Sequence, residues 1–307
     1  MAFRHAMDSR SASTSDATEG EEGRQHMLPH ALSIKNVWVK RSKRAKISLT
    51  LNVIFLVLLV VGTAIFERTL TPNHQYIPEE YIWNISYPVK PNTVPSWSVP
   101  LIALLGPFAC FVGYYLLYKE SWKNLLRETF ALVNAVFITT FITSVVKNVV
   151  GRPRPDFMGR CFPIGEPEWE DDLGYGYALC TTTDESDLDD VWRSFPSGHA
   201  SWSFAGLGFL SLWLLGRTKP YDGRREPWKI CLILIPFFLA TLVGLSRIID
   251  YRHFWTDVLG GALLGTGVAI FVYSVFYRSP FWIYAGEFRS SKDVVGYPTA
   301  DVETGAL

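Results

Sequence analysis

Six stretches of the chain contain no Asp, Glu, Lys or Arg, and they constrain the fold more than any other feature. Each stretch is 17 to 20 residues long. An α-helix rises about 1.5 Å per residue, so about 20 residues cross the roughly 30 Å hydrocarbon core of a bilayer. The stretches are 47–66, 99–118, 129–146, 200–216, 230–246 and 258–277.

Long unbroken apolar stretches are typical of membrane-spanning helices, whereas a membrane β-barrel shows short alternating segments. The sequence therefore predicts an all-α, polytopic membrane protein with six transmembrane helices. We expect a six-span domain over 47–280, a polar and partly disordered N-terminal tail at 1–46, and a C-terminal tail at 281–307. A soluble multidomain enzyme is excluded. The 29 Lys and Arg balance the 29 Asp and Glu, which gives no reason to expect a nucleic-acid partner.

Basic residues are distributed unevenly between the loops. A basic cluster lies at 35–46, before the first apolar stretch, and the loops at 119–128 and 217–229 also contain several Lys and Arg. The positive-inside rule places these segments, and with them both termini, in the cytosol. The acidic loop at 156–193 then faces a lumen or the extracellular space, and we interpret it as a solvated surface. The expected host membrane is the endoplasmic reticulum or the plasma membrane.

Two features of the outer loops depend on the compartment. Cys161 and Cys180 both fall in the long acidic loop, where an oxidising compartment would allow a disulfide bond; two unpaired thiols are an equal alternative. Asn84 begins an Asn-Ile-Ser glycosylation sequon, and an unmodified Asn84 is an equal alternative.

Three polar segments follow or precede the apolar stretches, and the predicted topology brings all three to one membrane face. They are 147–155, 194–199 and 246–257. Charges at the mouth of a membrane bundle are costly and tend to be functional. Lys147, Arg154 and Arg247 bring three cations together, which would repel a metal ion and bind a phosphate. Ser197 and Gly198, at the start of the fourth helix, add a hydroxyl and backbone N–H groups.

Two histidines, His199 and His253, lie in these segments. Asp257 follows His253 by four residues, so on a helix it can hold one ring nitrogen and raise the basicity of the other. Hydrolysis of phosphate monoesters is extremely slow without catalysis, and two histidines suit it, because one can attack phosphorus while the other protonates the leaving oxygen. For His253 and Asp257 alone, a structural hydrogen bond is the better interpretation. A zinc site of His199, His253 and Asp257 is disfavoured by the nearby cations.

The three segments together resemble a known motif. Lys147-x6-Arg154-Pro155, Pro196-Ser197-Gly198-His199 and Ser246-Arg247-x5-His253-x3-Asp257 resemble the three-part motif of the phosphatidic acid phosphatase type 2 superfamily. The resemblance is strongest to its lipid phosphate phosphatases of the plant-type branch, and extends over about residues 47–280. It implies a helical bundle of the type shared with haloperoxidases, and no metal or other cofactor.

The resemblance also implies the roles of the site residues. His253 is expected to be the nucleophile that forms a phosphohistidine, Asp257 to orient it, and His199 to act as general acid. The phosphate is expected to be held by Lys147, Arg154, Ser197, Gly198 and Arg247.

The function that follows is metal-independent hydrolysis of phosphatidic acid to diacylglycerol and phosphate. Diacylglycerol pyrophosphate and lysophosphatidic acid are further expected substrates, reached from within the membrane. Phosphatases for isoprenoid diphosphates, sphingoid base phosphates or soluble phosphomonoesters are alternatives within the same class. An anion transporter is the non-enzyme alternative. Paired polar residues at mid-membrane depth would favour it, but the polar segments lie at the ends of the apolar stretches. The sequence leaves the oligomeric state open, a homo-oligomer included.

Overall fold

The computed structural model describes residues 47–48, 50–164, 166–170, 173–280 and 286–289. The chain divides into one unit that ends at Phe55 and another that begins at Leu56. The described part of the first unit is helical. The predicted tail at 1–46, its basic cluster, and most of the tail at 281–307 lie outside the described residues. All regular secondary structure that the structure describes is helical, apart from three isolated β-bridges.

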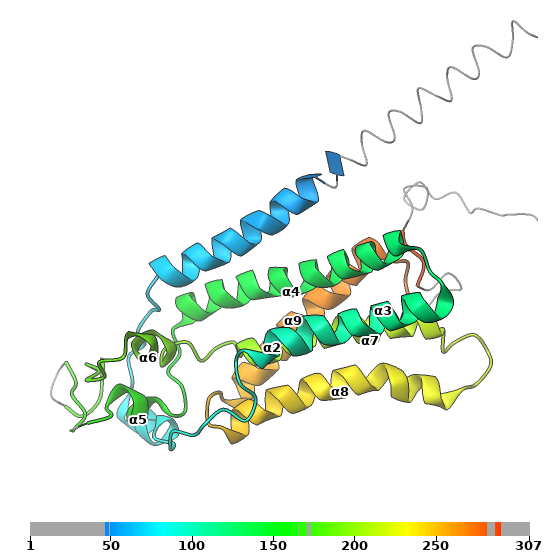
Figure 1. The fold of residues 1–307 in the computed structure, drawn as a ribbon. Helices are drawn as coiled ribbons and strands as arrows, with labels where there is room; N and C mark the ends of the chain where they lie inside the picture. The colour runs from blue at the N-terminus through cyan, green and yellow to red at the C-terminus, as the bar shows by residue number, and fades with distance from the viewer. Residues whose placement is uncertain (1–46, 49, 165, 171–172, 281–285, 290–307) are drawn as a thin grey trace, which may run out of the picture. The chain divides into compact units, whose positions relative to one another are not determined.

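Five helices in the described residues are long and apolar enough to cross a membrane (Figure 1). They are Thr50–Thr69, Ser98–Tyr118, α4 (Trp122–Val150), α8 (Pro227–Ile249) and α9 (Trp255–Phe276). Helix Ser98–Tyr118 is continuous through α2 (Ser98–Pro100), η2 (Leu101–Leu105) and α3 (Gly106–Tyr118). The predicted all-helical membrane fold is confirmed.

The remaining expected span, 200–216, is also a helix, α7 (Gly198–Thr218), but it is not among these five. It is less apolar than they are, and its position in the bundle allows this, because α7 contacts α3, α4, α8 and α9. Most of its residues are buried, among them Ser201, Ser203 and Ser211. A helix that is covered by other helices can carry small polar residues that a lipid-facing helix avoids. The count of six spans therefore depends on including α7.

The helices extend beyond the charge-free stretches that predicted them. For example, α4 begins at Trp122 rather than at residue 129, and contains Lys123, Arg127 and Glu128. A charge-free stretch marks the part of a helix that crosses hydrocarbon, whereas the helix itself continues into the interface, where charged side chains are tolerated.

Close packing of α7 against α9 fixes the two helix ends that carry site residues. A Cβ atom on Gly261 would lie 2.5 Å from the Ser197 carbonyl oxygen, and one on Gly265 would lie 2.3 Å from the Ser201 carbonyl oxygen. Glycines four residues apart allow such backbone contact between membrane helices. The Ser197 N–H also donates to the Asp257 carbonyl oxygen at 2.9 Å. The start of α7 is thus held directly against the start of α9.

The segments outside the bundle form a second, smaller core. Three short helices, η1 (Glu79–Ile85), α5 (Phe157–Cys161) and α6 (Glu185–Asp190), belong to these segments. Trp192 is fully buried there, stacked on His74 and edge-on to Phe157. The interpretation of 156–193 as a solvated surface is therefore wrong for part of this loop, because its aromatic residues pack together. The buried residues of this core are Ile77, Ile85, Phe157, Cys161, Phe162, Trp169, Val191 and Trp192.

Cys161 and Cys180 form a disulfide bond that closes this outer core. The cysteines are 19 residues apart. In the loop-entropy model, a bond that closes a loop of this length lowers the entropy of the unfolded chain and raises the free energy of unfolding by about 3 kcal/mol. We expect the Cys161→Ser/Cys180→Ser variant to lose about that much free energy of unfolding, measured by chemical denaturation in detergent. Cys231→Ser, which removes an exposed thiol, is the matched control. Equal denaturation midpoints for the double variant and the wild type would contradict a stabilising bond.

Candidate active site

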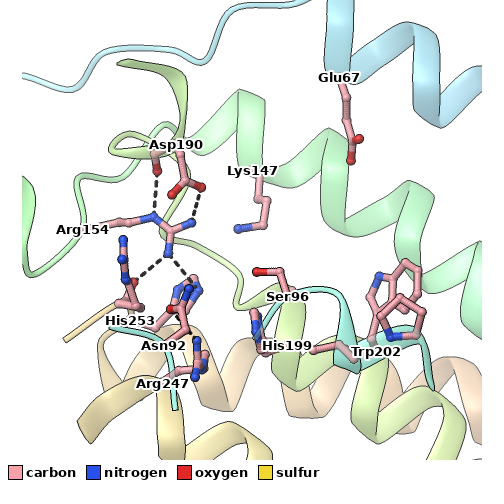
Figure 2. Close-up of a pocket in the computed structure, with 14 residues that line it drawn as sticks. Glu67, Asn92, Ser96, Lys147, Arg154, Asp190, His199, Trp202, Arg247 and His253 are labelled. Carbon is pink, nitrogen blue, oxygen red and sulfur yellow. Dashed lines mark hydrogen bonds and ion pairs between the residues drawn. The ribbon is translucent and has the colours of Figure 1, made fainter. Parts of the chain in front are cut away.

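One cavity of about 380 Å³ collects residues from all three polar segments (Figure 2). The predicted site residues that line it are Lys147, Arg154, Gly198, His199, Arg247 and His253. The other two, Ser197 and Asp257, are fully buried beside it. The further lining residues are Glu67, Asn92, Ser96, Val99, Pro100, Asp190, Trp202 and Arg252. The structure therefore brings together all eight residues that the sequence selected.

The end of α4 positions the first segment. Gly151 adopts a left-handed conformation (φ 59°), and its N–H donates to the Lys147 carbonyl oxygen at 3.0 Å. This is a common helix ending that favours glycine. Lys147 thus lies on the last turn of α4, where its Nζ donates to the Arg193 carbonyl oxygen at 2.6 Å. The chain then turns, which carries Arg154 into the cavity.

Arg154 is held by an acidic residue that the sequence analysis did not select. Its Nε donates to the Asp190 carbonyl oxygen at 2.7 Å, and its Nη2 pairs with Asp190 Oδ1 at 2.5 Å. Arg160 pairs with the other carboxylate oxygen of Asp190 at 2.9 Å. Burial raises the pKa of Asp190, but Arg154 and Arg160 outweigh it and hold that pKa well below its usual range. Asp190 is therefore an anionic anchor that fixes the Arg154 guanidinium.

His253 lies in the turn between α8 and α9 and is only 3% exposed. Its Nε2 lies 3.2 Å from Arg154 Nη1, and its Nδ1 lies 3.8 Å from Asp257 Oδ2. A guanidinium only donates hydrogen bonds, so we infer that Nε2 carries the lone pair and Nδ1 the proton. Burial and the charge of Arg154 lower the pKa of His253 to about 3, against the raising effect of the nearby Asp257 carboxylate. The imidazole is thus neutral near pH 7, as a nitrogen nucleophile must be.

Asp257 lies behind His253 in the first turn of α9, where the helix dipole favours an acidic side chain. Its Oδ2 accepts hydrogen bonds from Ser194 Oγ at 2.6 Å and from the Phe254 N–H at 3.0 Å. Its Oδ1 pairs with Arg152 at 2.7 Å. Arg152, which the sequence analysis did not select, therefore fixes the carboxylate that faces His253.

Arg247 is 1% exposed, and its guanidinium donates to three protein groups. The acceptors are Ser246 Oγ at 3.1 Å, Asn92 Oδ1 at 3.0 Å and Asp250 Oδ2 at 2.6 Å. A guanidinium has five N–H groups, so these contacts leave one N–H on each Nη for a ligand. That pair suits two oxygens of a phosphate. Asp250 is thus a second acidic residue that pairs with a site arginine and that the sequence analysis did not select.

The segment 92–94, between the first two long helices, connects two site residues. Thr93 donates to Asp250 through its N–H at 2.8 Å and its Oγ1 at 2.6 Å. The Val94 carbonyl oxygen lies 3.1 Å from His199 Nε2, so Nε2 is the nitrogen that carries a proton. The segment therefore orients both the guanidinium of Arg247 and the ring of His199.

The lining of the cavity favours an oxyanion. Lys147, Arg154, Arg247 and Arg252 all reach it. Arg252, which the sequence analysis did not select either, pairs with Asp156 at 3.3 Å. Within the described ranges, no group of three His, Cys, Asp or Glu side chains is placed to hold a metal ion. The arrangement combines a phosphate-binding set of cations with a neutral imidazole directed toward them.

Comparison with known proteins identifies the family. The sequence profile of the PAP2 superfamily matches residues 128–281. The chain belongs to this superfamily. The matched PAP2 region contains all three polar segments, whereas Glu67 and the segment 92–94 precede it. No solved structure matches the chain significantly.

Curated relatives cover most of the chain. "Lipid phosphate phosphatase 2" of Arabidopsis thaliana is 41% identical over 74% of this chain and 77% of its own length. "Lipid phosphate phosphatase 1" of the same plant is 38% identical over 81% of this chain and 76% of its own. "Diacylglycerol pyrophosphate phosphatase 1" of Saccharomyces cerevisiae is 36% identical over 68% of this chain and 70% of its own. The similarity thus extends well beyond the PAP2 region.

Proposed function

We propose that this PAP2 protein is a metal-independent lipid phosphate phosphatase that hydrolyses phosphatidic acid to diacylglycerol and phosphate. The observation that carries the proposal is the placement of His253, whose Nε2 faces Arg154 in a cavity that Lys147 and Arg247 also line. The names of the relatives, which include lipid phosphate and diacylglycerol pyrophosphate phosphatases, support the same class of substrate.

The reaction proceeds in two displacements. Oxygens of the phosphate bind Arg247, Arg154 and Lys147, and the Arg154 N–H that donates to His253 Nε2 donates to a phosphate oxygen instead, which frees the Nε2 lone pair. Nε2 then attacks phosphorus, and the bond from phosphorus to the lipid oxygen breaks. His199, protonated on both ring nitrogens while the phosphate is bound, gives one proton to that oxygen and becomes a neutral imidazole. Water next attacks the phosphohistidine with His199 as base, the P–N bond breaks, and phosphate leaves. Asp257 stabilises the positive charge that His253 carries in the intermediate.

We further propose that the active site faces a lumen or the extracellular space, with both termini in the cytosol. The disulfide between Cys161 and Cys180 supports this orientation, because disulfides persist in oxidising compartments and the outer core is adjacent to the site. The sequon at Asn84 lies in η1, on the same side, which suits glycosylation in that compartment. The endoplasmic reticulum or the plasma membrane is the proposed host membrane.

The proposal is tested with purified protein in detergent–lipid micelles that contain excess EDTA. We expect inorganic phosphate to be released from phosphatidic acid at an undiminished rate, because the cavity binds the substrate through cationic side chains rather than through a metal ion. Glycerol phosphate, which has the same phosphate ester but no acyl chains, is the matched soluble substrate and should react more slowly. A strict requirement for added Mg²⁺, or a preference for glycerol phosphate, would refute the proposal.

A further inference from the structure

The cavity contains an acidic side chain that binding of a phosphate does not explain. Two acidic residues line it, and Asp190 is paired with Arg154. The other, Glu67, accepts a hydrogen bond from the neutral hydroxyl of Ser144 at 2.7 Å. Figure 2 shows Glu67 on the side of Lys147 that faces away from Arg154. A negative charge at this place weakens phosphate binding, so we looked for another part of the substrate that Glu67 could bind.

Glu67 is closer to the middle of the bundle than the phosphate-binding groups are. Its partner Ser144 precedes Lys147 by three residues on α4, so it lies on the same face about 4.5 Å nearer the middle of that helix. Trp202 follows His199 by three residues on α7 and also lines the cavity, again one turn further from the helix end. The cavity therefore has a phosphate layer and a deeper layer one helical turn below it.

The deeper layer combines one acceptor with apolar walls. Val99, Pro100 and Trp202 line the cavity together with Glu67. In a lipid phosphate, the carbon that bears the phosphate is followed by a second carbon on the path to the hydrocarbon chain. With the phosphate held by the cations, a lipid that extends toward the middle of the bundle would place this second carbon near the depth of Glu67. An acidic side chain at that depth accepts a hydrogen bond from a donor on that carbon.

We propose that Glu67 is a specificity-determining residue that favours lipid phosphates with a hydrogen-bond donor on the carbon next to the phosphate-bearing one. Such a donor is the free hydroxyl of a lysophosphatidic acid or the ammonium of a sphingoid base phosphate. Phosphatidic acid has an acylated oxygen at this position and offers no donor. This inference rests on the proposed function of the cavity and adds a selectivity to it.

Glu67 also has a structural contact to consider, because its bond to Ser144 connects helix Thr50–Thr69 with α4. Phe66 and Phe141 join the same two helices through an edge-on ring contact with centroids 6.2 Å apart. If Glu67 acted only by joining the helices, its loss would lower the hydrolysis of every substrate by the same factor. A change in the ratio between substrates is the readout that a purely structural role does not produce.

The experiment compares kcat/KM for phosphatidic acid, lysophosphatidic acid and sphingosine phosphate in EDTA-containing micelles. We expect Glu67→Ala to lower the values for the two donor-bearing lipids about 10-fold relative to phosphatidic acid. Glu67→Gln retains a carbonyl acceptor without the charge, so it should retain the preference for the hydroxyl substrate and lose the preference for the ammonium substrate. Ser144→Ala, which removes the helix-joining bond and keeps the acid, should leave both ratios unchanged.

Unchanged substrate ratios in Glu67→Ala, whether all three activities fall equally or none falls, would overturn the assignment of Glu67. That result would leave the phosphatase function intact, because the wild type would still hydrolyse phosphatidic acid. If the wild type released phosphate from none of the three lipids, the proposed function itself would fail, and the inference with it.

Discussion

Replacing His253 by alanine is expected to lower phosphate release from phosphatidic acid by at least about 10³-fold, because the variant has no nucleophile. The ring occupies a buried position between Arg154 and Asp257, so an adjacent side chain cannot take its place. The measurement is the rate of phosphate release in micelles with EDTA. His74→Phe is the matched control, because it removes an imidazole outside the cavity and preserves an aromatic ring to stack on Trp192. The control should retain nearly full activity.

The same variant tests the covalent intermediate. Wild-type protein mixed with radiolabelled phosphatidic acid and quenched in base should carry a label that is stable in alkali and lost in acid, as expected of a phosphohistidine. His253→Ala should carry none. A label that persists in His253→Ala would show that another residue accepts the phosphoryl group, and a variant with full turnover would remove His253 from the mechanism.

The assembly of this site could be predicted because it depends on the order of the spans. Lys147, His199 and Arg247 lie at the ends of charge-free stretches, and successive spans cross the membrane in opposite directions. Alternate span ends therefore meet on one side, whatever the detailed packing. Spacing places Asp257 on the same helical face as His253, and the structure has the two groups 3.8 Å apart.

The acidic partners of the arginines could not be predicted, since they depend on tertiary packing. Segment 156–193 contains 11 acidic residues, yet among those whose side chains the structure describes only Asp190 lines the cavity, and no periodicity distinguishes it from the others. Arg152 reaches Asp257 from a turn more than 100 positions earlier. Asp250 follows Arg247 by three residues, a spacing at which side chains on a helix can pair. This spacing is the one sequence feature that indicates an acidic partner for a site arginine. Glu67 follows an apolar stretch directly, where a charge is normally read as an interfacial anchor.

Replacing Arg154 by glutamine is expected to lower kcat/KM for phosphatidic acid by about 10² to 10³-fold, the range found when one group that stabilises a transition-state oxyanion is removed. Arg154→Lys should not restore activity, because an ammonium lacks the planar fork that contacts Asp190 and the cavity at once. Arg224→Gln, in the exposed loop between α7 and α8, is the matched control and should behave as the wild type. Activity of Arg154→Gln within about threefold of the wild type would contradict a role in binding the phosphate.

The pH dependence of Arg154→Gln separates this role from simple misfolding. After burial, the charge of Arg154 is the largest influence that lowers the pKa of His253. Attack requires the neutral imidazole, so activity falls as the pH drops through that pKa. Without the neighbouring cation the pKa of His253 rises, and the acidic limb of the kcat/KM profile should move to higher pH. Asp190→Asn keeps the charge of Arg154 but removes the carboxylate that holds its guanidinium in position. This variant should therefore lower kcat/KM about 10-fold without moving the acidic limb to higher pH. An acidic limb at the same pH in Arg154→Gln and the wild type would mean that the cation does not act on the nucleophile.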